Sequence, residues 1–400
     1  MPLTPTGIVF IFLKITYEYN KLFLKHKLCY SKHMGFKTKN RASILFFIIV
    51  FSMMAASVGS AQTSVFAPAK VSSYAIAPVS KQESQSNVVQ TPHETTANTV
   101  SARHARAVEP SPVSENGLYF YTLSNGDVTR TDVRDSQGWL ATFTKGSRTV
   151  TLRGPQRTFT ESTAAASVAH DTWVRHLPTA YDTVIDKEWL KNALGDTTPD
   201  VLALAMQYID GAPELRDSNN MLISSNADYG PLLADGTREE GSDFNDYLGI
   251  SRQYGPLLDN PEAQQLASLD CSGYMRMIWG YKLGFPLAYS ADPSHIALPR
   301  RAVEMLASGP GTVIIPRKSI TKNDLQQLRP GDLVFNDAST NDGTDVDHVG
   351  LYLGVDTNGG YRFISSRKLS NGPTMGDTGG KSILNGGGLY AKTFVAARRL

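Results

Sequence analysis

The chain of 400 residues contains only two cysteines, Cys29 and Cys271. Cys29 lies in an N-terminal segment that has the features of a cleavable leader, so the processed protein would hold a single thiol. One thiol cannot form an intramolecular disulfide, even in the oxidising compartment to which such a leader sends a protein. We therefore expect a fold without a disulfide and a free thiol at Cys271.

Long hydrophobic runs are also scarce. The apolar run at residues 44–58 is shorter than the roughly 20 residues that a membrane span requires. Three basic residues between positions 37 and 41 precede this run and small residues follow it, which is the order of a secretory signal peptide. We therefore interpret residues 1–61 as a leader, and expect a secreted or extracellular protein that has no stable membrane span after cleavage.

The position of the apolar run suggests where translation starts. Some thirty residues precede its basic flank, which is unusual for a signal peptide. A start at Met34 would give a signal peptide of ordinary proportions. This predicts that residues 1–33 are an upstream extension.

The chain has little net charge, and its distribution argues against some partners. The formal net charge is +2, but residues 1–61 carry eight Lys or Arg and one acid, so the remainder has a charge of −5. The part that folds therefore lacks the basic excess typical of nucleic-acid binding, and we expect no nucleic-acid partner. The acidic stretch at residues 234–249 lacks EF-hand spacing, so we expect no metal and no other cofactor.

The sequence after the leader begins with two segments of different character. Residues 62–112 are rich in Ser, Thr, Ala, Pro and Gln without periodicity, which predicts a disordered tether. Residues 113–210 form an accessory segment that starts with a β-rich module between Gly117 and Phe159. Helical periodicity follows, with helices expected at residues 161–177, 186–194 and 198–209, the last capped by Thr198 or Asp200.

Residues 211–400 are expected to form the main domain. A helix should begin at Asp270 or Cys271 and end at Gly284, with strands after it. The strands are expected at residues 331–336, 348–355, 361–366 and 392–399. A helix followed by antiparallel strands is an α+β arrangement.

Cys271 and His348 are the candidate catalytic pair. A helix N-terminus and a nearby histidine lower a thiol pKa from about 8.5 towards the range in which the thiolate attacks well. His348 opens an apolar strand directly after a polar loop, where its side chain can face a cleft. Alternatively, Cys271 is a buried core residue and His348 a surface residue.

The two residues lie in a specific order of motifs: "DCSGYMRMIWGYKLG", then "LRPGDLVFND", then "DHVGLYLG". This order resembles the NlpC family of papain-like cell-wall endopeptidases, over residues 268–400. The resemblance implies a papain-like α+β domain in which Cys271 is the nucleophile and His348 the general base. It also implies hydrolysis of amide bonds in peptidoglycan stem peptides.

Two features depart from the family pattern. Where the family has a third polar residue, usually His, the best-aligned residue is Ser365, with Ser366 as the alternative if the register shifts by one. The family tyrosine upstream of the cysteine has no close match; Tyr254 in "RQYGP" is the nearer candidate and Tyr247 the more distant one. We expect Tyr254 to bind substrate.

Two further groups near the nucleophile are expected to take part. Ser272, directly after the nucleophile, is expected to bind substrate. The backbone N–H of Cys271 would serve the oxyanion hole.

These features predict a secreted cysteine peptidase that acts on peptidoglycan or another peptide substrate. Two alternatives remain: a catalytically weak envelope-binding or adhesion protein on the same fold, and a thiol acyltransferase. The sequence does not specify which amide bond is cleaved or the oligomeric state.

Overall fold

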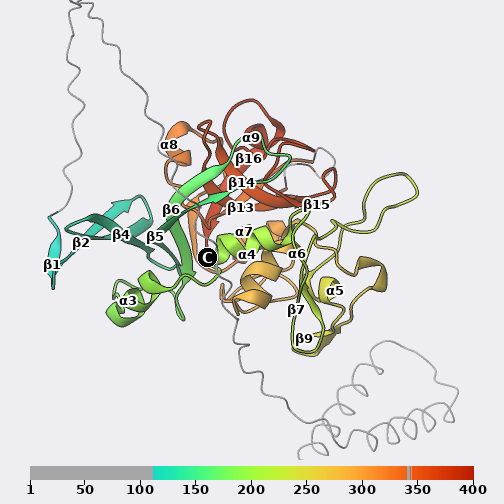
Figure 1. The fold of residues 1–400 in the computed structure, drawn as a ribbon, viewed down its shortest axis with the longest axis horizontal. Coiled ribbons are helices and arrows are strands. Elements are labelled where there is room, and N and C mark those ends of the chain that lie inside the picture. The colour runs from blue at the N-terminus through green and yellow to red at the C-terminus, as the bar shows by residue number, and fades with distance from the viewer. Residues whose placement is uncertain (1–110, 340–342, 344) are drawn as a thin grey trace, which may run out of the picture. The chain divides into compact units, whose positions relative to one another are not determined.

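The computed structural model describes residues 111–339, 343 and 345–400 (Figure 1). The predicted leader, and the predicted tether up to residue 110, lie outside the described residues. Within the described ranges, no helix combines the length and hydropathy needed to cross a bilayer.

An antiparallel sheet of six strands opens the described part, with the strands in chain order (Figure 1). The Asn125–Gly126 turn joins two of them, and Gly126 adopts a positive φ of 57°, which glycine tolerates well. One face of this accessory sheet packs on helix α3 (Lys187–Gly195) through Phe143, Leu152 and Leu190. The strands are β1 (Val113–Glu115), β2 (Leu118–Asn125), β3 (Val128–Asp135), β4 (Gly138–Thr144), β5 (Thr149–Phe159) and β6 (Val168–His176).

The helix expected at residues 161–177 is wrong, because most of that segment is strand β6. β6 pairs with β5 with one shift of register between Arg153 and Arg157, and Trp173 lies opposite Leu152. Valine and tryptophan fit a pleated surface, and cross-strand pairing overrides the helical spacing of the alanines. Helix α3 and the short α4 (Val201–Ala205) confirm helices at the two later positions, and Asp200 caps α4 by accepting from Ala203 N.

A second antiparallel sheet of six strands forms most of the C-terminal part, in the order β11-β16-β12-β13-β14-β15. Together with the helices it makes the fold α+β, as expected. Strands at all four expected positions are confirmed. Short helices and strands that the sequence did not predict lie before and between these four strands. The elements are α7 (Ala302–Ser308), β11 (Thr312–Ile315), α8 (Lys322–Leu325), β12 (Leu333–Asn336), β13 (His348–Val355), β14 (Tyr361–Arg367), β15 (Gly372–Thr374), α9 (Leu389–Thr393) and β16 (Phe394–Arg399).

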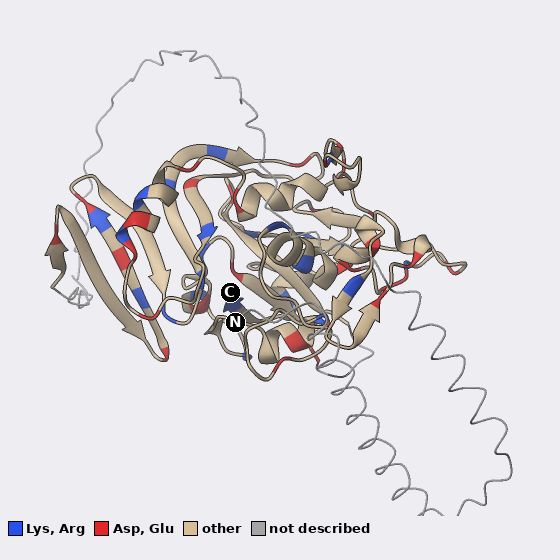
Figure 2. Ribbon diagram, turned by 90° about the horizontal axis from the view of Figure 1, so that it is seen from below, with Lys and Arg blue, Asp and Glu red and all other residues tan. Residues whose placement is uncertain are grey.

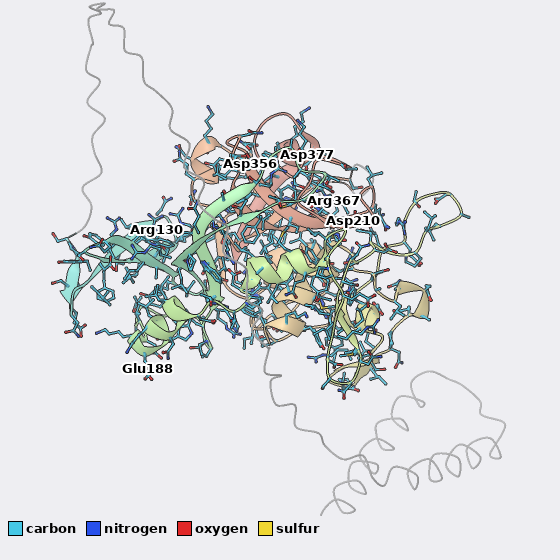
Figure 3. All side chains as sticks on the ribbon, in the orientation of Figure 1. Arg130, Glu188, Asp210, Asp356, Arg367 and Asp377 are labelled. Carbon is cyan, nitrogen blue, oxygen red and sulfur yellow. The ribbon has the colours of Figure 1, made fainter. Side chains whose placement is uncertain are left out.

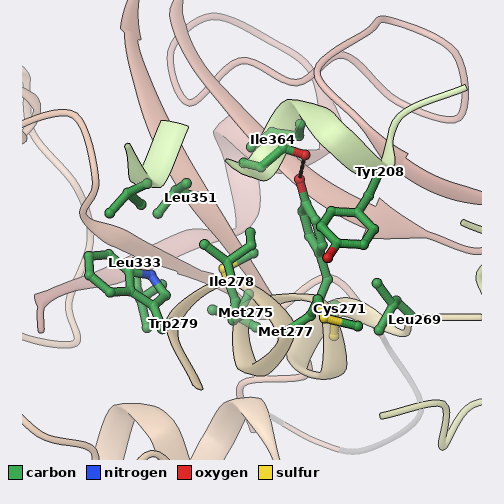
Figure 4. Packing of buried hydrophobic residues seen from close by; sticks show 14 of the residues in the cluster. Tyr208, Leu269, Cys271, Met275, Met277, Ile278, Trp279, Leu333, Leu351 and Ile364 are labelled. Carbon is green, nitrogen blue, oxygen red and sulfur yellow. Dashed lines mark hydrogen bonds between the residues drawn. The ribbon is translucent and has the colours of Figure 1, made fainter. Parts of the chain in front are cut away.

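Helix α6 (Cys271–Met275) packs against this sheet. It continues as the π-helical segment η3 (Arg276–Lys282), and the chain leaves it at Gly284, whose φ is +73°. The helix therefore begins and ends where the sequence predicts. Its buried side chains join those of β12, β13 and β14 in one hydrophobic cluster (Figure 4).

The region between α4 and α6 is mostly loop, as expected, with short elements along it. The elements are η1 (Met206–Tyr208), β7 (Leu215–Arg216), β8 (Leu222–Ser224), α5 (Phe244–Leu248), β9 (Arg252–Tyr254), β10 (Leu257–Asp259) and η2 (Ala263–Gln265).

Polar contacts hold the accessory sheet against the C-terminal sheet. Arg399 of β16 forms a buried pair with Asp332, at 2.7 and 2.8 Å, and also donates to Thr144 of β4 at 2.6 Å. The Leu400 carbonyl accepts hydrogen bonds from the backbone N–H groups of Arg148 and Thr149. Acidic and basic residues are interspersed over the accessory sheet, so its strands present both signs of charge (Figure 2).

Candidate active site

Cys271 is the first residue of α6 and is buried, with 7% of its surface exposed. The carboxylate of Asp270 caps the helix by accepting from the Gly273 N–H at 2.7 Å. The thiol Sγ lies 3.8 Å from the Asp347 carbonyl oxygen, to which it can donate. Because His348 follows Asp347, the helix start places the thiol against the start of β13. Figure 4 shows Cys271 at the edge of the cluster that contains Met275 and Leu351.

His348 is held by Ser365 on the neighbouring strand β14. The His348 Nε2 lies 3.0 Å from the Ser365 Oγ, and Ser365 is fully buried. Ser366 turns the other way and donates to the Leu269 carbonyl. The alternation of side chains along β14 therefore brings Ser365, and not Ser366, to the imidazole. The Tyr390 ring lies on the imidazole, with the two ring centres 5.2 Å apart.

Cys271 and His348 line one cavity of about 730 Å³, together with Ser272. Its wall carries groups of both charges. Among the described residues, the basic members are Arg300, Arg301, Arg367 and Lys368, and the acidic members are Glu240, Asp270, Asp345 and Asp347. Arg367 comes from the end of β14 and is labelled in Figure 3.

Tyr254 is not among the described residues that line this cavity. Its hydroxyl accepts a hydrogen bond from Arg276, a fully buried residue whose Nε also contacts Asp243 at 2.9 Å. The geometry therefore connects Tyr254 to a buried ion pair, and its contact with substrate stays a prediction.

Tyr229 lines the cavity in its place, and the sequence reasoning missed it. The Tyr229 hydroxyl donates to the Glu240 carboxylate at 3.3 Å, and Lys368 pairs with the same carboxylate at 2.8 Å. The only local signal was the Tyr-Gly pair at residues 229 and 230, which stands 42 residues before Cys271. A sequence separation of that size, across a region of loops, does not indicate that Tyr229 lies near Cys271.

Arg300 is the second residue that the sequence reasoning missed. Its guanidinium donates to both oxygens of Asp270, at 3.2 and 2.7 Å, and to the Ser272 Oγ at 2.7 Å. It also lies 3.7 Å from Asp243. Burial alone would raise the pKa of Asp270, but Arg300 and the backbone N–H groups of Gly273 and Gly241 hold this pKa below its usual value.

The expectation of a lowered thiol pKa is wrong for this resting geometry. Burial raises the pKa of Cys271 to about 12, and the neighbouring Asp270 carboxylate adds to the rise. Burial lowers the pKa of His348 to about 3, with Arg367 adding to the effect. Both shifts favour the uncharged forms of the two groups. The carboxylate cap beside the thiol opposes the helix N-terminus on which the expectation rested.

The described residues include no group of three or more His, Cys, Asp or Glu side chains arranged to hold a metal ion. The cavity offers a thiol, an imidazole and charged side chains for its chemistry. This set can perform nucleophilic attack with proton transfer.

A buried cysteine at a helix start and a histidine on the adjacent strand define the kind of site found in cysteine hydrolases. Residues 260–372 match the model of the NlpC/P60 family, which confirms the family likeness noted in the sequence. This segment of the chain is thus similar to the NlpC/P60 family. At the level of the family, that supports a peptidase-type function on the cell wall.

The other comparisons add little. A crystal structure from Staphylococcus aureus, described as similar to a lipoprotein of the NLP/P60 family, is 17% identical to this chain, with a TM-score of 0.25. The match covers 56% of this chain and 50% of that one, so the chain spans about half the length of that structure. A TM-score this low carries no argument about fold or function. No curated protein matches the chain.

Proposed function

We propose that the protein is a secreted cysteine peptidase that hydrolyses amide bonds in peptidoglycan stem peptides. The observation that carries this proposal is the meeting of Cys271 and His348 in one cavity, with Ser365 holding the imidazole. A core cysteine would not need a histidine fixed beside it in the wall of a cavity.

The hydrogen bond to Ser365 assigns roles to the two ring nitrogens of His348. When Nε2–H donates to the serine hydroxyl, Nδ1 is left unprotonated and can accept the Cys271 proton. The sulfur then attacks the amide carbonyl, and the backbone N–H of Cys271 stabilises the oxyanion. His348 returns the proton to the leaving amine, and water hydrolyses the thioester in the second half of the reaction.

The pKa shifts determine when the proton moves. Because burial disfavours both the thiolate and the imidazolium, a charged pair does not form in the resting site. Proton transfer would then accompany the attack on a bound substrate, as it does when a serine attacks with histidine as base. Peptidoglycan stem peptides carry carboxylates and amines, and the mixed charges of the cavity wall complement such a substrate.

Digestion of purified peptidoglycan, followed by mass spectrometry of the muropeptides, tests the proposal. Cys271→Ala and His348→Ala should each abolish cleavage while circular dichroism and the unfolding midpoint stay close to wild type. His295→Ala is the matched control, because His295 is an exposed histidine outside the cavity and should retain full activity. Full cleavage by Cys271→Ala would end the proposal.

One observation favours a second candidate, a catalytically weak envelope-binding protein on the same fold. The thiol is buried, and its raised pKa makes it a poor nucleophile at neutral pH. This candidate predicts that wild type sediments with insoluble peptidoglycan but releases no muropeptides from it. The digestion described above distinguishes the two functions.

A further inference from the structure

A second cavity, of about 610 Å³, lies between the accessory sheet and the C-terminal sheet. The end of β13, at Gly354 and Val355, forms part of its wall, whereas His348 begins that strand and lines the active-site cavity. The two cavities share none of their lining residues. The volume falls within the range of about 300–1,000 Å³ that is typical of small-molecule sites.

A row of polar side chains lines the cavity from the accessory sheet. Asp132, Thr142 and Thr151 are direct neighbours across β3, β4 and β5, so they share one face of the sheet. The Trp139 Nε1 donates to the Thr142 Oγ1 at 2.9 Å, and this hydroxyl donates to Asp132 at 2.7 Å. The chain of hydrogen bonds fixes the indole beside the row.

Thr151 is the exception in this row. It is only 3% exposed, yet its Oγ1 has no hydrogen-bond partner among the described residues. Buried polar atoms almost always have a partner, and an unpaired one costs free energy. The hydroxyl therefore leaves one hydrogen bond unmade in this wall of the cavity.

The opposite wall comes from the C-terminal sheet and is aromatic. Tyr352 and Tyr361 stack with their ring centres 6.1 Å apart and an angle of 21° between the rings. Next to them, the Arg329 guanidinium donates one hydrogen bond of 3.3 Å to the Leu328 carbonyl, and forms no ion pair with any residue that the structure describes. The tyrosine rings and the Arg329 guanidinium thus line the same cavity as the hydroxyl and carboxylate groups of the accessory sheet.

We propose that this cavity binds a saccharide chain. A pyranose ring has C–H faces that stack on aromatic rings and hydroxyls at its edge that pair with carboxylate, hydroxyl and guanidinium groups. Trp139 and Tyr361 supply the rings, and Asp132, Thr151 and Arg329 supply the polar partners. The choice of the peptidoglycan glycan strand as the ligand rests on the proposed function, since that polymer carries the stem peptides.

Binding is best measured on the full chain carrying Cys271→Ala, so that no hydrolysis interferes. The probes are peptide-free peptidoglycan glycan strands and cellotetraose, titrated by isothermal calorimetry. We expect saturable binding of the strands, which Trp139→Ala and Arg329→Ala each weaken at least 10-fold. Binding of cellotetraose with the same sensitivity would assign the cavity to saccharides in general.

Thr151→Val keeps the proposal testable if the other variants fold poorly. Valine has the shape of threonine, and the hydroxyl that it removes has no partner, so folding should not suffer. We expect binding about 3- to 10-fold weaker, the effect of one lost hydrogen bond. Thr158→Val, at an exposed position of β5 outside the cavity, should bind as the parent does.

The proposal is overturned if neither saccharide binds, or if binding is unchanged in Trp139→Ala, Arg329→Ala and Thr151→Val. Hydrolysis of isolated stem peptides by wild type, measured in parallel, separates the two proposals. Cleavage without saccharide binding would remove only the saccharide site, and binding without cleavage would remove only the peptidase function.

Discussion

Arg300→Ala tests the electrostatic support of the helix that carries Cys271. In the wild type, Arg300 contacts both oxygens of Asp270 and the hydroxyl of Ser272. Asp270 and Arg300 are largely buried, with 9% and 17% of their side chains exposed. The substitution leaves the Asp270 carboxylate buried with its N–H donors but without its cation.

The expected loss depends on pH. Removing one partner of a buried ion pair costs about 3–5 kcal/mol, because a buried charge stays uncompensated. In the wild type the folded pKa of Asp270 lies below 3.8, so its contribution to stability is present above that pH and is lost as the pH falls through the folded pKa. In the variant, burial raises the folded pKa above 3.8, so charging Asp270 destabilises the variant as the pH rises. The difference in unfolding free energy should therefore reach about 3–5 kcal/mol at pH 7 and be smaller near pH 3.

Urea unfolding followed by circular dichroism, at several pH values from 3 to 8, measures this difference. Arg301→Ala is the matched control, because that neighbour forms no ion pair within the described part of the chain and should change stability by less than about 0.5 kcal/mol. A loss in Arg300→Ala that is independent of pH, or below about 1 kcal/mol at pH 7, would refute the reasoning. Asp270→Asn in the Arg300→Ala background should recover part of the loss, because it removes the unpaired charge.

Three further predictions concern the site and its helix. Because burial raises the pKa of Cys271 to about 12, the rate of alkylation by iodoacetamide should rise about tenfold per pH unit from pH 7 to 10, with no plateau near neutrality. Urea should accelerate the alkylation at pH 7, because unfolding exposes the thiol. Ser365→Ala should lower kcat on muropeptides by about 10- to 100-fold and leave KM unchanged. This loss is smaller than the roughly 10⁴-fold loss seen when the charged orienting residue of a serine-protease triad is replaced. Ser365→His should retain or raise kcat. Gly273→Ala would place a Cβ 2.1 Å from the Ser242 carbonyl oxygen and should cost about 1–3 kcal/mol in urea unfolding, whereas Gly195→Ala, with no atom within 4 Å of its Cβ, should not.

The sequence predicts best what depends on local signals. The helix of Cys271 has a capping residue before it and a glycine after it, so both ends could be assigned. Ser365 was assigned from the family resemblance, and the alternation of side chains along its strand distinguishes it from Ser366. The helix ends and the alternation along the strand are determined by residues within a few positions of one another.

Contacts formed across long stretches of loop were not predictable. Tyr229 and Arg300 reach the cavity from loops on either side of α6, and neither lies in a periodic pattern that would fix its direction. The misassigned helix at residues 161–177 has the same origin, because pairing with β5 decides its conformation. In both cases the partner lies elsewhere in the chain, and the local sequence does not contain it.

The thiol pKa shows why a motif alone does not determine reactivity. A helix start and a histidine favour a thiolate, and Cys271 has both, yet burial and the Asp270 carboxylate outweigh them. Asp270 is part of the same motif, since it caps the helix, so the residue that positions the nucleophile also opposes its ionisation. Arg300 offsets this cost by pairing with the cap. The reactivity of the thiol therefore depends on a cation 29 residues away in the sequence, and on the environment that a bound substrate creates.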